Sequence, residues 1–143
     1  MVDTSAYMEQ SWLSLYTSCI YPALTYLETR HKAADASLQV RTDFALVCFC
    51  DHAPYGDRLL RTFYFTSKLS QFNEWAKSLT FYGGGYAQNA VCEGLSAAVQ
   101  LLQSGENKSV EQYILLASNS AVRALDTPCK LAQQEGTSVN IYV

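Results

Sequence analysis

Charged side chains are scarce in this chain of 143 residues, of which only 16% are Asp, Glu, Lys or Arg. Ten basic residues stand against 13 acidic ones, so the formal net charge is −3. The basic residues are scattered along the chain, whereas a surface that binds nucleic-acid phosphates needs a clustered excess of Lys and Arg. The composition therefore argues against a dedicated nucleic-acid surface, and we expect no direct nucleic-acid partner.

Two further absences concern membranes and secretion. No apolar run is long enough to cross a bilayer, and Met1-Val2-Asp3-Thr4-Ser5 lacks the basic flank and apolar stretch of a secretory signal. We therefore expect a soluble protein with no membrane partner. The cysteines form an odd set, which is typical of reduced thiols inside a cell. They are Cys19, Cys48, Cys50, Cys92 and Cys129.

Apolar residues make up 49% of the chain and recur with helical and strand spacing in turn. Alternating helices and strands predict an α/β fold, in which a three-layer, doubly wound and mostly parallel sheet carries helices on both faces. We expect one domain over residues 1–143, clipped at the first strand and at the C-terminus. The expected helices cover 7–30, with a kink or restart at Pro22, then 70–79, 89–103 and 128–134. The expected strands cover 42–50 at the centre, 59–66 at an edge or antiparallel, 81–82, 112–117 and 139–143, and a polar loop covers 31–37.

Three consecutive glycines form the most distinctive local feature. They follow Phe81 and Tyr82 and lead into an apolar-periodic helix, so the backbone must turn sharply there. The spaced glycines of a dinucleotide site and the lysine of a phosphate-binding loop are both missing, which argues against nucleotide binding. Exposed tyrosines are common interface anchors. We therefore predict a protein-binding rim made of Tyr82, Gly83, Gly84, Gly85 and Tyr86.

Cysteine and histidine chemistry has little support in the sequence. Cys48 and Cys50 fall on the same face of an apolar strand, where buried and inert thiols are expected. Asp51 and His52 belong to a turn, and adjacent residues seldom converge on one substrate atom. We predict no catalytic residues and no small-molecule substrate. A small hydrolase or transferase with its site at the glycine loop remains an alternative.

Several segments resemble, in order, the N-terminal von Willebrand A-type domain family of Mediator subunit 25. The most specific are Phe72, Trp75, Leu79 and Phe81 ahead of the glycines, with Glu93-Gly94-Leu95 after them. Tyr21-Pro22-Ala23-Leu24, Asp43 to Phe49 and Leu115 to Ser120 extend the resemblance over almost the whole chain. It implies a non-catalytic docking module of a transcriptional coactivator, located in the nucleus, with other Mediator subunits as partners and no cofactor.

The same resemblance implies where a metal would bind. Classical A-type domains hold a divalent cation with an Asp-x-Ser-x-Ser loop, a later threonine and a later aspartate. Asp3 and Ser5 match the loop, but Tyr7 replaces its second serine, and the later positions fall near Ala90 and Ser118. One carboxylate is too little for Mg²⁺. We expect no metal, with Asp3 and Ser5 as a degenerate remnant that caps the first helix; a metal-dependent adhesion or ligand-binding domain is the alternative.

Overall fold

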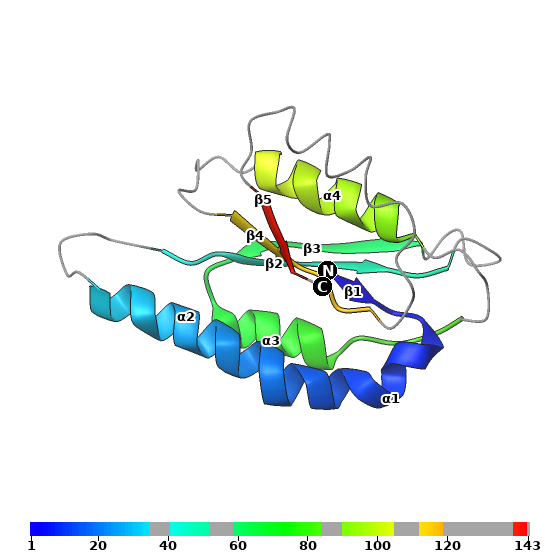
Figure 1. Ribbon diagram of the computed structural model, residues 1–143, viewed down its shortest axis with the longest axis horizontal. Helices are drawn as coiled ribbons and strands as arrows, with labels where there is room; N and C mark the ends of the chain where they lie inside the picture. Colours follow the sequence, from blue (N-terminus) through cyan, green and yellow to red (C-terminus); the bar gives the residue numbers. More distant parts are fainter. Residues whose placement is uncertain (35–40, 52–58, 84–89, 105–111, 119–138, 143) are drawn as a thin grey trace.

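The structure is a computed structural model that describes residues 1–34, 41–51, 59–83, 90–104, 112–118 and 139–142. Its helices and strands alternate along the chain, which confirms the predicted α/β class (Figure 1). The strands are β1 (Val2–Asp3), β2 (Phe44–Phe49), β3 (Leu60–Thr66), β4 (Gln112–Leu115) and β5 (Val139–Tyr142). The helices are α1 (Ala6–Leu15), the π-helical turn η1 (Tyr16–Ile20), α2 (Tyr21–Ala34), α3 (Leu69–Lys77) and α4 (Val91–Ser104).

Strand β1 connects two groups of strands. It runs parallel to β2, with Val2 opposite Cys48, and Val2 also bridges in parallel to Ala117, just after β4. The N–H of Asp3 donates to the carbonyl of Ala117 at 2.9 Å, and the N–H of Ala117 donates to the carbonyl of Met1 at 3.0 Å. Because β5 runs parallel to β4, only the β2–β3 pairing is antiparallel among the described strands. The predicted interior position of 42–50 and the antiparallel edge at 59–66 are both confirmed.

Helices cover both faces of the sheet (Figure 1). One face carries α1, η1, α2 and α3, and the other carries α4. Side chains of β2 alternate between the two sides, as the pleat of a strand requires. Leu46 belongs to the core beneath α1 and α3, whereas Val47 belongs to the core beneath α4. The first core also contains Met8, Trp12, Tyr16, Phe44, Cys48, Phe72 and Ala76, and the second also contains Leu95, Ala98, Val99, Leu101 and Ile114.

The first helical region is longer than predicted and contains a π-helical turn. A π-helical turn precedes Pro22, and the N–H of Tyr21 donates to the carbonyl of Tyr16, five residues earlier. Proline lacks an N–H, so its cost is smallest in the first turn of a helix, where Pro22 lies in α2. The helix then continues to Ala34. The predicted polar loop is therefore wrong over 31–34, because polar residues are compatible with a helix.

Other boundaries differ by a few residues, and one predicted strand is absent. Phe81 and Tyr82 lie outside any strand, although both were predicted to form one. The N–H of Tyr82 donates to the carbonyl of Thr4 outside any ladder, and aromatic β-propensity alone does not supply a ladder. The predicted helix at 128–134 lies outside the described residues. So do Gly84, Gly85 and Tyr86.

Candidate functional site

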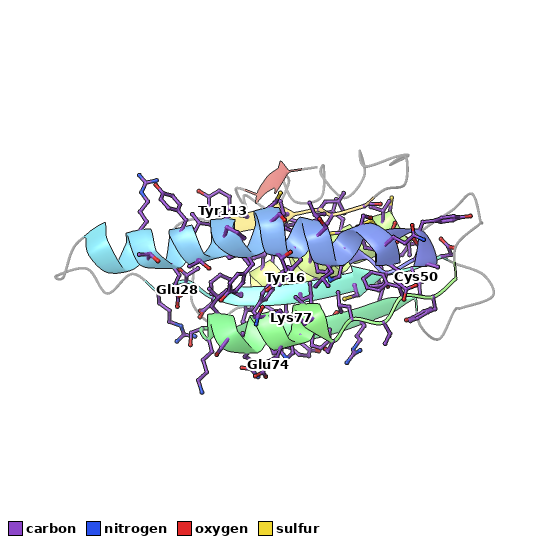
Figure 2. The ribbon with its side chains drawn as sticks, turned by 90° about the horizontal axis from the view of Figure 1, so that it is seen from below. Tyr16, Glu28, Cys50, Glu74, Lys77 and Tyr113 are labelled. Carbon is purple, nitrogen blue, oxygen red and sulfur yellow. The ribbon has the colours of Figure 1, made fainter. Side chains whose placement is uncertain are left out.

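Polar residues gather at one end of the sheet. β1 and β2 have their carboxyl ends there, and Ser118, a few residues after β4, lies there too. In open α/β sheets ligands bind at this end of parallel strands, so it is the first place to look for a site. We use the name polar end for Asp3, Thr4, Ser5, Asp51 and Ser118. The first four are buried, and Asp3 has no exposed surface at all. Cys50, which precedes Asp51, lies at the same end as the start of α1 (Figure 2).

The Asp3 carboxylate is held by groups of the chain itself. Its Oδ1 accepts the N–H of Ser5 at 2.9 Å, and its Oδ2 accepts the hydroxyl of Ser118 at 2.9 Å. A buried carboxylate is costly unless hydrogen bonds compensate for the lost water. The contact with Ser118 therefore gives Asp3 a structural role, because it ties β1 to the segment after β4.

Helix α1 begins without the side-chain cap that the sequence predicted. Ser5 is the N-cap residue, but its hydroxyl makes no capping bond and is buried with no hydrogen-bond partner among the described residues. Asp3 accepts the N–H of Ser5 itself and not that of a residue inside α1. The capping prediction is therefore wrong for both residues, because neither side chain accepts an N–H from inside α1. The reason is local, because the bond from the Ser5 N–H to the Asp3 carboxylate closes a turn ahead of the helix.

The donor set at the polar end does not fit a Mg²⁺ site. It offers the carboxylates of Asp3 and Asp51 and the hydroxyls of Thr4, Ser5 and Ser118, but Ser118 donates to Asp3 and Thr4 donates to the carbonyl of Phe49. Ala90, at the position of the classical threonine, is fully buried and brings no side-chain oxygen. Tyr7, in place of the second serine, is 64% exposed. No cluster of three or more His, Cys, Asp or Glu is found among the described residues.

Both ends of the glycine loop are anchored to the polar end. The N–H of Tyr82 donates to the carbonyl of Thr4 at 3.1 Å, and the thiol of Cys50 donates to the carbonyl of Tyr82 at 3.2 Å. Beyond the loop, the N–H of Ala90 donates to the carbonyl of Cys50 at 2.9 Å. Gly83 has φ 77°, a left-handed conformation that favours glycine. The structure thus places Tyr82 and Gly83 beside the polar end, with Tyr82 half-buried.

Sequence analysis missed the part played by Thr4. Its hydroxyl donates to the carbonyl of Phe49 at 2.9 Å, and its N–H donates to the same oxygen at 2.8 Å. Thr4 therefore joins β1 to the end of β2 and also receives the N–H of Tyr82. The sequence did show a threonine between Asp3 and Ser5. The Asp-x-Ser-x-Ser pattern allows any residue at that position, so it predicted no role for Thr4.

A small hollow lies beside the anchored loop. Thr4, Cys48, Arg61, Leu79, Thr80 and Tyr82 line it, and its volume is about 10 Å³. A volume of this size holds about one water molecule, whereas small-molecule sites enclose roughly 300 Å³ or more. This hollow therefore does not accommodate an organic substrate.

The described thiols at this end are protonated and sheltered. Burial raises the pKa of Cys48 to about 12, and burial together with nearby Asp51 and Asp3 raises the pKa of Cys50. Burial and the neighbouring Glu93 also raise the pKa of Cys92. The thiolate is the reactive form of cysteine, so these shifts favour the inert thiols that the sequence predicted. His52 and Cys129 lie outside the described residues.

Comparison with known proteins gives two findings. The family model described as Mediator complex subunit 25 von Willebrand factor type A matches residues 1–138. A curated relative from Solanum lycopersicum, named Mediator of RNA polymerase II transcription subunit 25, is 27% identical over 118 residues. That match covers 78% of this chain but 14% of the relative, so the chain spans a small part of the relative's length. None of the described helices combines the length and apolar character needed to span a bilayer.

Proposed function

Because the chain belongs to the Mediator complex subunit 25 von Willebrand factor type A family, we propose that it is a Mediator component acting in transcription by RNA polymerase II. The single observation that carries this proposal is the family match over residues 1–138, which includes nearly every described element. In finer terms, the chain is a protein-binding module of a transcriptional coactivator. It docks a subunit 25-like protein to other Mediator subunits in the nucleus.

The finer fold assignment is part of the same proposal. Residues 1–143 constitute one von Willebrand A-type domain with a doubly wound sheet between two helical layers. Helices on both faces of the sheet and the parallel pairings of β1 with β2 and β4 with β5 support this assignment (Figure 1).

The module acts without catalysis, metal or cofactor. The polar end supports this proposal because its carboxylate from Asp3 is already engaged by Ser5 and Ser118. The hollow beside Tyr82 holds about one water, and the raised pKa of Cys48 and Cys50 disfavours nucleophilic thiolates. No small-molecule substrate, nucleic acid or membrane partner is needed for a docking role.

The docking surface in this proposal is the glycine-loop rim, Tyr82 to Tyr86, together with the exposed part of the first helix. Anchoring of Tyr82 to Thr4 and Cys50 supports the rim as a surface, because it fixes the backbone on which a partner would be received. On the first helix, Tyr7 is 64% exposed and Leu13 is 57% exposed. Aromatic and apolar anchors of this kind are common at the centre of protein interfaces.

The test is affinity purification of the tagged chain from a nuclear extract, with mass spectrometry of the proteins retained. We expect recovery of other Mediator subunits, and a recovery about tenfold lower for Tyr82→Ala, because loss of an interface anchor costs roughly 1.4 kcal/mol or more. The matched control is Tyr113→Ala, a 52% exposed tyrosine on β4, which we expect to behave like wild type. Failure of the folded wild-type chain to retain Mediator subunits would contradict the docking proposal.

A metal-dependent ligand-binding domain is the second candidate, and one observation favours it. The Ser5 hydroxyl is buried without a described hydrogen-bond partner beside the Asp3 carboxylate, which is a position a cation ligand would occupy. The engagement of Asp3 by Ser5 and Ser118 counts against it. Magnesium-dependent melting separates the two candidates and is described in the Discussion.

A further inference from the structure

The continuous helical rod formed by α1, η1 and α2 lies at the outside of the molecule but carries almost no charge (Figure 1). No charged residue occurs from Gln10 to Leu27. Large side chains are nevertheless exposed along it, with Leu13 57% and Tyr26 63% exposed. The short helix α3, by contrast, presents Glu74 and Lys77 to solvent. Because the centres of protein interfaces are poor in charge and rich in aromatic residues, the rod has the composition of an interface.

Five exposed residues of the rod recur at every fourth position. Residues four apart are neighbours on a helix surface, so these five lie in a row along it. We use the name neutral row for Leu13, Thr17, Tyr21, Thr25 and Thr29. Glu9, one turn before Leu13, is also exposed and gives the row one acidic end.

The threonine hydroxyls of the neutral row bond to carbonyls of the rod itself. Thr17 donates to the carbonyl of Leu13 at 2.8 Å, and Thr25 donates to that of Tyr21 at 2.8 Å. Thr29 donates in the same way to the carbonyl of Thr25 at 2.7 Å. Burial of a polar group is costly chiefly when its hydrogen bonds are lost. Another protein can therefore cover these threonines while their hydroxyls keep their bonds.

The same self-sufficiency restricts what can cover the neutral row. The backbone N–H and C=O groups inside a helix are already paired, so a partner's backbone finds no ladder there. A strand laid on the row would lose water from its own N–H and C=O groups without replacing those bonds, whereas a helix arrives with them paired. A charged side chain would also lose water without meeting an opposite charge in the row. The row therefore favours a helix with an uncharged face.

We propose that the neutral row binds the uncharged face of an α-helix of another protein. This inference rests on the docking function proposed above, under which that protein is another Mediator subunit. The bound helix runs beside α1 and α2 at a crossing angle of about 20°, the class in which rows of period four meet rows of period three. It carries a Lys or Arg at the end that meets Glu9, because Glu9 is exposed and forms no ion pair among the described residues.

The charges that flank the uncharged stretch favour a protein over a lipid surface. The first charged residue on either side is acidic, Glu9 before the stretch and Glu28 after it. Helices that lie on membrane surfaces carry basic residues beside their apolar face, because these attract anionic lipid headgroups. Acidic residues at both ends would be repelled by such headgroups, whereas Glu9 can pair with a basic residue of a protein partner.

Charge substitutions test the neutral row in the nuclear-extract assay. Thr25→Lys and Thr25→Glu should each lower the retention of Mediator subunits at least about tenfold, because either charge would be buried without a partner. The matched controls, Gln100→Lys and Gln100→Glu at an exposed position of α4 on the other face of the sheet, should behave like wild type. Circular dichroism verifies that each variant is folded. Unchanged retention in both folded Thr25 variants, or a loss with only one sign of charge, would overturn the proposal.

Photocrosslinking in the same extract identifies the segment that covers the row. Leu13→benzoylphenylalanine and Thr25→benzoylphenylalanine place reactive groups about 18 Å apart along the rod, at about 1.5 Å per residue. A helical partner should therefore be captured at two residues about 12 apart, whereas an extended segment would be captured at residues about 5 apart. We expect the helical spacing, with no charged residue on the captured face. The extended spacing, a charged face, or capture of a second copy of this chain would overturn the proposal.

A third crosslinking position separates this inference from the docking proposal. Tyr82→benzoylphenylalanine reports on the glycine-loop rim. Capture of Mediator subunits at Tyr82, with nothing captured at Leu13 or Thr25, would overturn the neutral row as a binding surface and leave the docking proposal standing. Capture of an uncharged helix at Leu13 and Thr25 in a protein outside Mediator would support the helical partner and contradict docking to Mediator.

Discussion

At the scale of single residues, the Cys48 thiol is deeply buried and has a strongly raised pKa. Its side chain is 3% exposed in the core beneath α1 and α3, and burial raises its pKa from 9.0 to about 12. A pKa of 12 instead of 9 lowers the thiolate population at pH 8 about 1,000-fold. The consequence is a thiol that neither reacts nor ionises while the chain is folded.

This acidity predicts a loss of stability in alkali. The folded chain favours the protonated thiol, so the contribution is complete below the unfolded pKa of about 9. This contribution to the free energy of unfolding then falls by about 1.4 kcal/mol per pH unit as the pH rises toward 12. Tyr16, whose pKa burial also raises to about 12, adds a loss of the same sign only above pH 10. Urea denaturation at pH 8, 9 and 10 measures the effect.

Two variants separate Cys48 from the rest of the chain. Between pH 9 and 10, the free energy of unfolding of Cys48→Ala should fall less than that of wild type. At pH 8 the variant should be less stable than wild type, because it loses the volume of the buried sulfur atom. Cys19→Ala, at an exposed cysteine, should keep the wild-type slope. An identical slope in all three proteins would contradict the burial argument.

At the scale of elements, the packing of α4 on the sheet depends on Gly94. A Cβ at this position would lie 3.1 Å from Cδ1 and 3.2 Å from Cβ of Phe49, and 3.1 Å from Cε of Met1. Phe49 has no exposed surface and its Cβ is fixed to β2, so it has little room to move. Glycine at this position allows the helix to approach the strand closely, which gives the Glu93-Gly94-Leu95 motif a physical reason.

We therefore expect Gly94→Val to lower the free energy of unfolding by about 2 kcal/mol, since overfilled cores typically cost about 1–3 kcal/mol. Gly94→Ala should cost less, because alanine regains about 1 kcal/mol of helix propensity. Urea denaturation of both variants measures the difference. Ser96→Val, a β-branched substitution at a half-buried position of the same helix, controls for propensity and should change stability by less than Gly94→Val. A Gly94→Val protein as stable as wild type would show that the close approach is not required.

At the scale of the whole molecule, the polar end joins distant parts of the chain. Asp3 bonds Ser118 across 115 residues, and Thr4 bonds the end of β2 and the entry of the glycine loop. These hydrogen bonds lie at the polar end, which is where a cation binds in classical A-type domains. The chain therefore stabilises its polar end with its own hydrogen bonds.

The corresponding prediction concerns magnesium. If the polar end holds no cation, thermal melts with Mg²⁺ and with EDTA should coincide. A native-state site would add about 2.7 kcal/mol at a magnesium concentration about 100 times its Kd, which raises Tm by several degrees. Asp3→Asn should shift Tm equally in both conditions, because its effect is on hydrogen bonding alone. A magnesium-dependent rise in Tm that disappears in Asp3→Asn would favour the ligand-binding alternative.

The sequence by itself determined the α/β class, the interior position of β2 and the edge position of β3. These properties follow from local periodicity: the apolar run from Phe44 to Phe49 requires cover on both faces, while the mixed pattern from Leu60 to Thr66 does not. The sequence also predicted a kink or restart of the first helix at Pro22, and α2 begins at Tyr21 after the π-helical turn. Family resemblance rested on motifs such as Phe72, Trp75 and the triple glycine.

Only the tertiary structure decided how the polar end is connected. The bond between Asp3 and Ser118, the unpartnered hydroxyl of Ser5 and the anchoring of Tyr82 on Thr4 and Cys50 all join segments far apart in sequence or depend on burial. Local propensity predicted a strand at Phe81 and Tyr82 and a capping Ser5. Both predictions failed: the Tyr82 N–H bonds Thr4 outside any ladder, and the Ser5 hydroxyl makes no capping bond. Periodicity fixes which face of an element is buried, but only packing in three dimensions determines which polar groups meet.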